Sequence, residues 1–267
     1  MKCAHSFSLT CKLSALIVTA LCAVSVLAAC APSGYVSPYN WEDLQRQGEK
    51  LVYAPEGVVE SRWGVDVSAH QHSIDWQQVA DAGVQFAFVR LGNRGATEGV
   101  LYEDEFFMAN ATGAHQAGIP VSAYFFSQAI SEDEVQAEAD LALSLLAQAE
   151  AEGVRFEAVA FDHEAVDVEG ARANDLDGDT LSAFAISFCE RMERAGYEPL
   201  VYGNQRDLGK LHRVIHSAYP LWLAEYEVGA PTAQFDFILW QYSNAGSIPG
   251  IPTDVDLNIW LPLPEAS

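Results

Sequence analysis

Two acids stand two residues apart in the sequence FDHE at residues 161–164, directly after an apolar run at 156–160. If this run is an extended strand, Asp162 and Glu164 project to the same side, because side chains alternate along a strand. Two carboxyl groups held close together do not both ionise easily near neutral pH, so one keeps its proton while the other stays charged. A proton donor beside a carboxylate is the chemistry that cleaves glycosidic bonds. An isolated D-x-E is more often a pair of solvated acids, so the hypothesis depends on the surrounding elements.

Strand-like and helix-like segments alternate from residue 62 onward. This alternation is typical of a parallel sheet, and about eight strands in roughly 200 residues predict an α/β protein with a single irregular TIM-like β/α barrel. Neither an internal repeat nor a second domain is evident. The helix expected at 132–150 begins with a predicted capping box, Ser131 with Glu134. The strands are expected at residues 63–68, 85–91, 120–127, 156–162, 199–202, 221–225, 237–242 and 255–259, and the other helices at 76–82, 104–117 and 181–195.

Polar and aromatic residues stand where these strands are predicted to end, which is the face on which β/α barrels build their active sites. A ring of acids and aromatics around one rim is expected of a cleft that binds carbohydrate. Some of the aromatics, Trp240 first, are equally consistent with plain core. The rim candidates are Asp66, Tyr124, Phe126, Asp162, Glu164, Tyr202, Trp222, Tyr226, Trp240, Gln241 and Asp256.

Five segments, in order, resemble the family 25 glycoside hydrolases, the bacterial and phage muramidases often called lysozymes. The resemblance covers residues 63–259. The matching segments are GVDVS at 64–68 with His70, Gln71 and IDW at 74–76; the D-x-E pair; LWLA at 221–224 with Tyr226; WQY at 240–242 with Gly246 and Gly250; and VDLN at 255–258.

The resemblance implies an irregular β/α barrel that cuts the β-1,4 bond after N-acetylmuramic acid in peptidoglycan, without metal or cofactor. Position by position, Glu164 resembles the proton donor and Asp162 its partner acid. Asp66 and Asp256 resemble the other acids of the cleft floor. The expected substrate contacts are Tyr124, Phe126, Tyr202, Trp222, Tyr226 and Gln241.

The substrate sugar carries a 2-acetamido group whose carbonyl oxygen can attack its own anomeric carbon if a carboxylate orients the amide. Asp162 could serve in this way while Glu164 protonates the leaving oxygen and later activates water, a substrate-assisted retaining route. Direct attack by a carboxylate and an inverting path through water remain open, because each requires a particular separation of the acids.

Two positions depart from the family's pattern. The first motif usually continues with glycine after the glutamine, and here His72 stands in that place. A side chain there could narrow a subsite or alter the loop, which affects substrate preference more than chemistry. Thr253 and Asp254 likewise replace a small or glycine-like approach to the last motif.

Other functions are weaker. A chitinase-like hydrolase shares the final D-x-E, but Glu157 and Ala160 break the acid relay of its motif. A peptidoglycan-binding lipoprotein without turnover is a second alternative. His70 and His72 near Asp66 suggest a metal-dependent deacetylase but lack a third ligand. The acids at 175–179 resemble a calcium loop, yet Phe184 stands where a bidentate Glu is needed, so they are better interpreted as a helix start.

The N-terminus predicts export. Lys2 and Lys12 precede an apolar run at 13–29 that ends in small residues before Cys30. This resembles a bacterial lipobox, which implies a signal peptide at 1–29, lipid on the Cys30 thiol and a protein anchored in the cell envelope outside the cytoplasm. Residues 30–60 are expected to be a tether, and residues 61–263 the hydrolase domain.

Charge and cysteines limit the partners. The chain has 37 acidic and 14 basic residues and a formal net charge of -23, which becomes about -25 without the signal peptide. So acidic a surface repels phosphate backbones, which argues against nucleic-acid binding. Of the five cysteines only Cys189 falls in the predicted domain, within an apolar helical pattern, so a disulfide framework is excluded and a buried thiol is expected. We expect a monomer.

Overall fold

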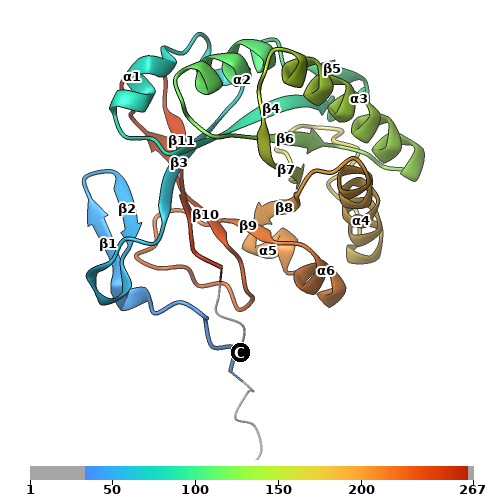
Figure 1. The fold of residues 1–267 in the computed structure, drawn as a ribbon. Coiled ribbons are helices and arrows are strands. Elements are labelled where there is room, and N and C mark those ends of the chain that lie inside the picture. The colour runs from blue at the N-terminus through green and yellow to red at the C-terminus, as the bar shows by residue number, and fades with distance from the viewer. Residues whose placement is uncertain (1–33, 264–267) are drawn as a thin grey trace, which may run out of the picture. The chain divides into compact units, whose positions relative to one another are not determined.

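Eight strands close into a barrel with helices on its outside (Figure 1). The computed structural model describes residues 34–263, and the unit that contains the barrel begins at Ser37. Strands follow one another around the barrel in chain order, and β3 pairs with both β4 and β11 to close the ring. The predicted irregular barrel is confirmed. Its strands are β3 (Arg62–Val67), β4 (Phe86–Arg94), β6 (Val121–Ser127), β7 (Phe156–His163), β8 (Pro199–Asn204), β9 (Leu221–Ala224), β10 (Leu239–Gly246) and β11 (Val255–Trp260), and β5 (Leu101–Glu103) adds to the edge of β4.

The last barrel strand runs against its neighbours. β11 is antiparallel to both β10 and β3, whereas the other barrel pairs are parallel. The expectation of a wholly parallel sheet is therefore wrong for β11. A parallel crossover needs a dozen or more residues, and only residues 247–254 join β10 to β11.

The predicted helices are present and cover the barrel strands (Figure 1). The Ser131 hydroxyl caps the third of them by accepting a hydrogen bond from the Glu134 amide, but the Glu134 carboxylate accepts from the Ile130 amide instead, so the capping box is half formed. Asp177 caps the next helix by accepting from the Thr180 amide, which confirms that the acids at 175–179 start a helix. The helices are α1 (Trp76–Asp81), α2 (Phe107–Gln116), α3 (Glu132–Ala151), α4 (Gly178–Arg194), α5 (Gln205–Leu208) and α6 (Arg213–Ala218), with 3₁₀ turns at Trp41–Asp43, Pro55–Gly57 and Ala69–Gln71.

The barrel interior is packed with side chains that alternate along the strands. On β7, Ala158 and Ala160 point inward and leave room for Phe86 and Phe88 of β4. Gly64 serves the same purpose on β3, since a Cβ there would lie 2.5 Å from the Phe86 ring. Continued alternation brings the acids that follow on the same strands to the barrel mouth. A second, larger cluster between strands and helices contains Cys189, which is buried as expected.

Residues 44–53 form a hairpin of β1 (Leu44–Gln47) and β2 (Lys50–Tyr53), where the sequence predicts a tether. Leu51 and Tyr53 are buried in the main core. Tyr242 of β10 fixes the hairpin: its hydroxyl donates to the Glu49 carbonyl at 2.8 Å and accepts from the Leu51 amide at 3.3 Å. The tether prediction is therefore wrong for this segment, because contiguous apolar residues in β2 find a surface on the barrel that the local pattern does not reveal.

Removal of the Tyr242 hydroxyl should loosen the hairpin. Tyr242→Phe leaves the Leu51 amide and the Trp63 indole N–H, which also donates to this oxygen at 2.7 Å, without their acceptor. We expect the free energy of unfolding to fall by about 1–3 kcal/mol, measured by urea denaturation. The matched control is Tyr219→Phe, a buried tyrosine whose hydroxyl has no hydrogen-bond partner within residues 34–263. An equal loss in both variants would contradict the assignment.

Candidate active site

A cleft of about 370 Å³ lies at the carboxyl ends of the parallel strands. Side chains from all eight barrel strands, and from the loops that follow some of them, line it. All four candidate acids and all six candidate substrate contacts reach this cleft. They are Asp66, Asp162, Glu164 and Asp256, with Tyr124, Phe126, Tyr202, Trp222, Tyr226 and Gln241.

Strand register explains why residues so far apart in the sequence meet. Phe126, Asp162, Tyr202 and Trp222 are paired across four consecutive parallel strands, so they form one layer of the barrel. Glu164 follows two residues after Asp162, immediately past the end of β7, and is partly exposed at the mouth.

Asp66 is the centre of a buried hydrogen-bond network. One of its carboxylate oxygens accepts from the Asn258 amide at 2.7 Å and from the Gln241 amide at 2.8 Å. The Gln241 carbonyl in turn accepts from the hydroxyls of Tyr202 and Tyr226. Burial raises the pKa of Asp66 to about 6, and the two amide donors act in the opposite direction. The network fixes the position of the Asp66 carboxyl group. Because both amides donate to its ionised form, Asp66 loses its proton more readily than the neighbouring acids.

Asn258 is a site residue whose role the sequence analysis did not identify. Its side chain links Asp66 to the Trp222 indole, which donates to the Asn258 carbonyl oxygen at 2.9 Å. Asn258 is fully buried. The available signal was its spacing: it lies two residues after Asp256 on the same strand, and residues two apart share a face.

The two acids at the end of β7, Asp162 and Glu164, are both shifted toward the protonated form. Burial, followed by the charge of Glu164, raises the pKa of Asp162 well above its usual range. Burial and the charge of Asp66 raise the pKa of Glu164 to about 7. One carboxylate oxygen of Asp162 is buried and has no hydrogen-bond partner among the described residues. A buried acceptor without a donor is free to receive one from a bound ligand.

Asp256 extends the cluster across the barrel mouth. It is paired in register with Asp66 because β11 runs antiparallel to β3. Burial and the charges of Asp66 and Glu164 raise the pKa of Asp256 to about 8. Four carboxyl groups this close cannot all be charged near neutral pH, so the cluster retains protons there.

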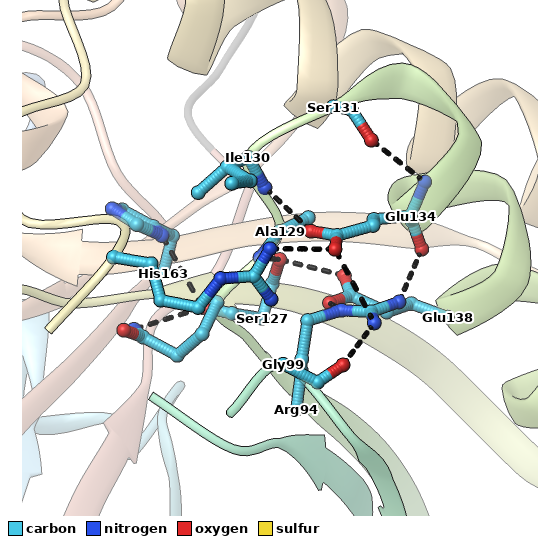
Figure 2. A network of polar contacts seen from close by, with 11 residues as sticks. Arg94, Gly99, Ser127, Ala129, Ile130, Ser131, Glu134, Glu138 and His163 are labelled. Carbon is cyan, nitrogen blue, oxygen red and sulfur yellow. Dashed lines mark hydrogen bonds and ion pairs between the residues drawn. The ribbon is translucent and has the colours of Figure 1, made fainter. Parts of the chain in front are cut away.

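A network behind the cleft holds the segment that bears Glu164 (Figure 2). The buried Gln128 amide donates to the Glu164 carbonyl at 2.8 Å and to the Ser127 carbonyl at 3.0 Å. The Ser127 hydroxyl donates to Glu138 at 2.6 Å, and Arg94 donates to the other oxygen of Glu138 at 2.7 Å. Figure 2 also shows His163 against Ser127. Gln128, which is buried, bonds the main-chain carbonyl of Glu164. The network therefore restricts the backbone of Glu164 rather than its carboxyl group.

The aromatic candidates divide into two groups. Trp240 is fully buried in the core, and its indole donates to the Glu225 carbonyl, so it does not line the cleft. Trp222 borders the cleft but is only 1% exposed, with its ring centroid 4.4 Å from that of Phe88. Tyr124 and Tyr226 are partly exposed. The side chains that can present a ring face to a sugar are therefore Tyr124, Phe126 and Tyr226, while the buried Tyr202 and Trp222 form the floor.

Arg90 and His70 also line the cleft; the sequence analysis gave Arg90 no role and considered His70 only as a metal ligand. Arg90 donates to Asp104 at 2.8 Å, and its charge opposes the rise in the pKa of Asp162. Arg90 follows Phe86 and Phe88 at steps of two on β4, so alternation alone could have placed it at the mouth.

His72 has a backbone conformation that is typical of glycine. Its φ of 55° and ψ of -143° lie in a region that glycine populates far more readily than other residues. The side chain is exposed and does not line the cleft, so it does not narrow it. Asp254 is at the other position that departs from the family's pattern. Its main-chain carbonyl accepts a hydrogen bond from the Gln71 side-chain amide at 3.1 Å, which ties the turn at His72 to the segment before β11.

Two of the alternative functions lack a matching geometry. Glu157, which would begin a chitinase-type relay, is paired with Arg62 at 2.7 Å at the opposite end of β7 from Glu164. Within residues 34–263, no three His, Cys, Asp or Glu side chains are arranged to hold a metal ion, so His70 and His72 have no ligand set there.

Comparison with known proteins agrees with this geometry. The family model for glycosyl hydrolases family 25 matches residues 65–251, and the chain belongs to this family. Lysozyme M1 of Streptomyces globisporus is 30% identical over 207 residues, which cover 73% of this chain and 66% of that protein. The autolytic lysozyme of Clostridium acetobutylicum is 26% identical, and the match covers 73% of this chain and 54% of that protein. This chain therefore spans about half to two thirds of these relatives.

The solved structure of a bacterial lysozyme from Streptomyces coelicolor shares the fold. It is 28% identical with a TM-score of 0.60, and the match covers 74% of this chain and 90% of that one. The β1–β2 hairpin lies outside the residues that the family model matches.

The crowded acids should lower stability as pH rises. A carboxyl group whose pKa is raised on folding binds more protons in the folded than in the unfolded state, so stability is lost between the unfolded and the folded pKa. For Asp256 this window runs from about pH 4 to about 8. Asp256→Asn should therefore raise the free energy of unfolding by about 1–2 kcal/mol at pH 8 and by almost nothing below pH 4.

Denaturant unfolding at both pH values checks this expectation. Glu103→Gln, which neutralises an exposed acid on β5, is the control and should change neither value. A gain that is the same at both pH values would show that Asp256 is not electrostatically strained.

Proposed function

We propose that this protein is a peptidoglycan hydrolase, an N-acetylmuramidase that cleaves the β-1,4 bond between N-acetylmuramic acid and N-acetylglucosamine. The observation that carries the proposal is the pair of carboxyl groups at the end of β7, the buried Asp162 and the partly exposed Glu164, at the mouth of a family 25 barrel. Membership of the family and the similarity to two lysozymes support the choice of substrate.

Glu164 is the proposed acid and base. With a pKa of about 7 it holds a proton at neutral pH. It can therefore protonate the leaving sugar oxygen and then, as a carboxylate, activate the water that completes hydrolysis. The hydrogen bond from Gln128 to its carbonyl keeps the residue in place during both steps.

Asp162 is the proposed partner of the substrate's acetamido group. Its unpartnered carboxylate oxygen can accept the acetamido N–H, which would orient the amide oxygen toward the anomeric carbon. A hydrogen bond from the acetamido N–H also stabilises the ionised form of Asp162. Substrate binding would therefore favour the negative charge on Asp162 that the transition state requires. This is the substrate-assisted retaining route.

Asp66 is proposed to stabilise positive charge on the sugar ring, with Asp256 beside it as a neutral acid near neutral pH. Tyr124, Phe126 and Tyr226 are proposed to contact the sugars, with Tyr202, Trp222 and Gln241 as the supporting lining. Aromatic and neutral polar groups suit a sugar better than the acidic surface around them. The binding-only alternative has no specific support in the cleft, where all four acids are present.

We also propose that the mature protein begins at Cys30 and is a lipid-anchored monomer of the bacterial cell envelope, outside the cytoplasm. Cys30 and the apolar run before it lie outside the described residues, so this proposal rests on the sequence. Within residues 34–263 no helix is long and apolar enough to cross a membrane.

Replacement of the proton donor should abolish turnover but not binding. Glu164→Gln keeps the shape of the side chain and cannot give up a proton, so the release of muropeptides should fall by at least about 100-fold. Wild-type activity should fall as pH rises through about 7, since the acid must start protonated. Glu157→Gln, on the same strand but paired with Arg62, is the control and should keep full activity.

Mass spectrometry of the released products identifies the bond that is cut, because a muramidase leaves N-acetylmuramic acid at the reducing end. Wild-type turnover by folded Glu164→Gln protein would disprove the catalytic assignment. Products with N-acetylglucosamine at the reducing end would point instead to the chitinase-like activity.

The anchor can be tested by fractionation. Cys30→Ala removes the thiol that would carry the lipid, so the protein should leave the membrane fraction or remain unprocessed. Cys189→Ala, which removes the buried thiol of α4, is the matched control and should leave the distribution unchanged. Recovery of the wild-type protein wholly soluble and without lipid would contradict the proposal.

A further inference from the structure

A second groove, of about 460 Å³, lies between the hairpin, the loop that follows β9 and the second half of β10. We call it the hairpin groove. Arg46 of β1 lines it on one side, and Glu227 and Ser243 on the other. It shares two lining residues, Tyr226 and Asn244, with the cleft described above, so the two spaces are continuous.

The groove is a built feature and does not depend on a loose terminus. Tyr242, which lines it, binds Glu49 and Leu51 through its hydroxyl, and the Glu49 carboxylate accepts from the Ser247 amide at 2.9 Å. The hairpin is thus tied through its turn and through β2 to β10 and to the segment that follows it. The Arg46 guanidinium lies 5.7 Å from the centre of the Tyr242 ring.

The charges of the groove are unsatisfied by the protein. Arg46 is exposed and makes no ion pair within residues 34–263, in a chain with a formal net charge of -23. Glu227 has a φ of 60°, a conformation that is uncommon for a residue with a side chain. Strain of this kind concentrates in segments whose position matters for binding.

A groove with one cation and one anion is poorly suited to the sugars of the glycan, which are neutral while the lactyl carboxyl group of N-acetylmuramic acid is amide-linked to the peptide branch. The peptide branch of peptidoglycan, in contrast, carries carboxylate and ammonium groups. A glycan held in the cleft would present that branch close to Tyr226, where the two spaces join. Complementary charges at such a rim confer specificity more than affinity.

We propose that the hairpin groove is a subsite for the peptide branch of the glycan, in which Arg46 pairs with a carboxylate of the branch and Glu227 faces its ammonium group. The proposal rests on the proposed muramidase function. It assigns a role in substrate selection to an element outside the residues matched by the family model, which begins at Val65.

The test compares one peptidoglycan preparation before and after its peptide branches are removed by an amidase. Arg46→Ala should raise the KM for branched strands by about three- to five-fold with kcat unchanged, and should leave both constants unchanged on stripped strands. Arg46→Lys keeps the charge and should restore most of the KM. Arg213→Ala, which removes an exposed arginine of α6, is the control and should match the wild type on both substrates.

A binding experiment separates this proposal from the proposed function. Calorimetry on catalytically inactive Glu164→Gln protein, with and without Arg46→Ala, uses a soluble muropeptide tetrasaccharide and its peptide-free counterpart. Arg46→Ala should weaken binding of the branched ligand alone, by the same factor. Equal weakening of both ligands, or of neither, would overturn the subsite even if the wild type is an active muramidase. Absence of any turnover by the wild type would overturn the muramidase function, while the binding comparison would still decide on the groove.

Discussion

Two side-chain amides that converge on one oxygen of Asp66 fix the geometry of the barrel mouth. Asn258 and Gln241 come from neighbouring strands at the far end of the chain, and each is held in turn by an aromatic hydrogen-bond donor. A buried carboxylate is costly unless its hydrogen bonds are satisfied. Since Asp66 is satisfied and Asp162 is not, the protein leaves one defined acceptor for the substrate.

The reversed direction of β11 is what brings these groups together. In the antiparallel register, Asp256 faces Asp66, and Asn258 lies two residues further toward the barrel interior. A parallel strand would present its carboxyl end at the mouth, so Trp260 rather than Asp256 would lie there. The irregularity of the barrel is thus part of the site, because it places the fourth acid within the electrostatic reach of the other three.

Much of this could be predicted from the sequence. The apolar runs mark all eight barrel strands, and spacing by two identifies the D-x-E pair at the end of β7. The direction of β11 could not be predicted, because side chains alternate in the same way on parallel and antiparallel strands. Only the length of the connection from β10 to β11 distinguishes the two directions. The hairpin could not be predicted because β1 is polar and mostly exposed. The hairpin is held by Tyr242, which is almost 200 residues away in the sequence.

The same burial that prepares Glu164 to donate a proton also raises the pKa of Asp256, which donates no proton in the proposed reaction but lies in the same cleft. A less crowded mouth would be more stable at neutral pH and would leave Glu164 ionised, hence unable to protonate the leaving group. The layer beneath these acids is closely packed, since the Trp222 ring contacts the rings of both Phe88 and Tyr202. Substrate selection can then vary at the hairpin, which contacts the barrel through Tyr242 and leaves this acid cluster undisturbed.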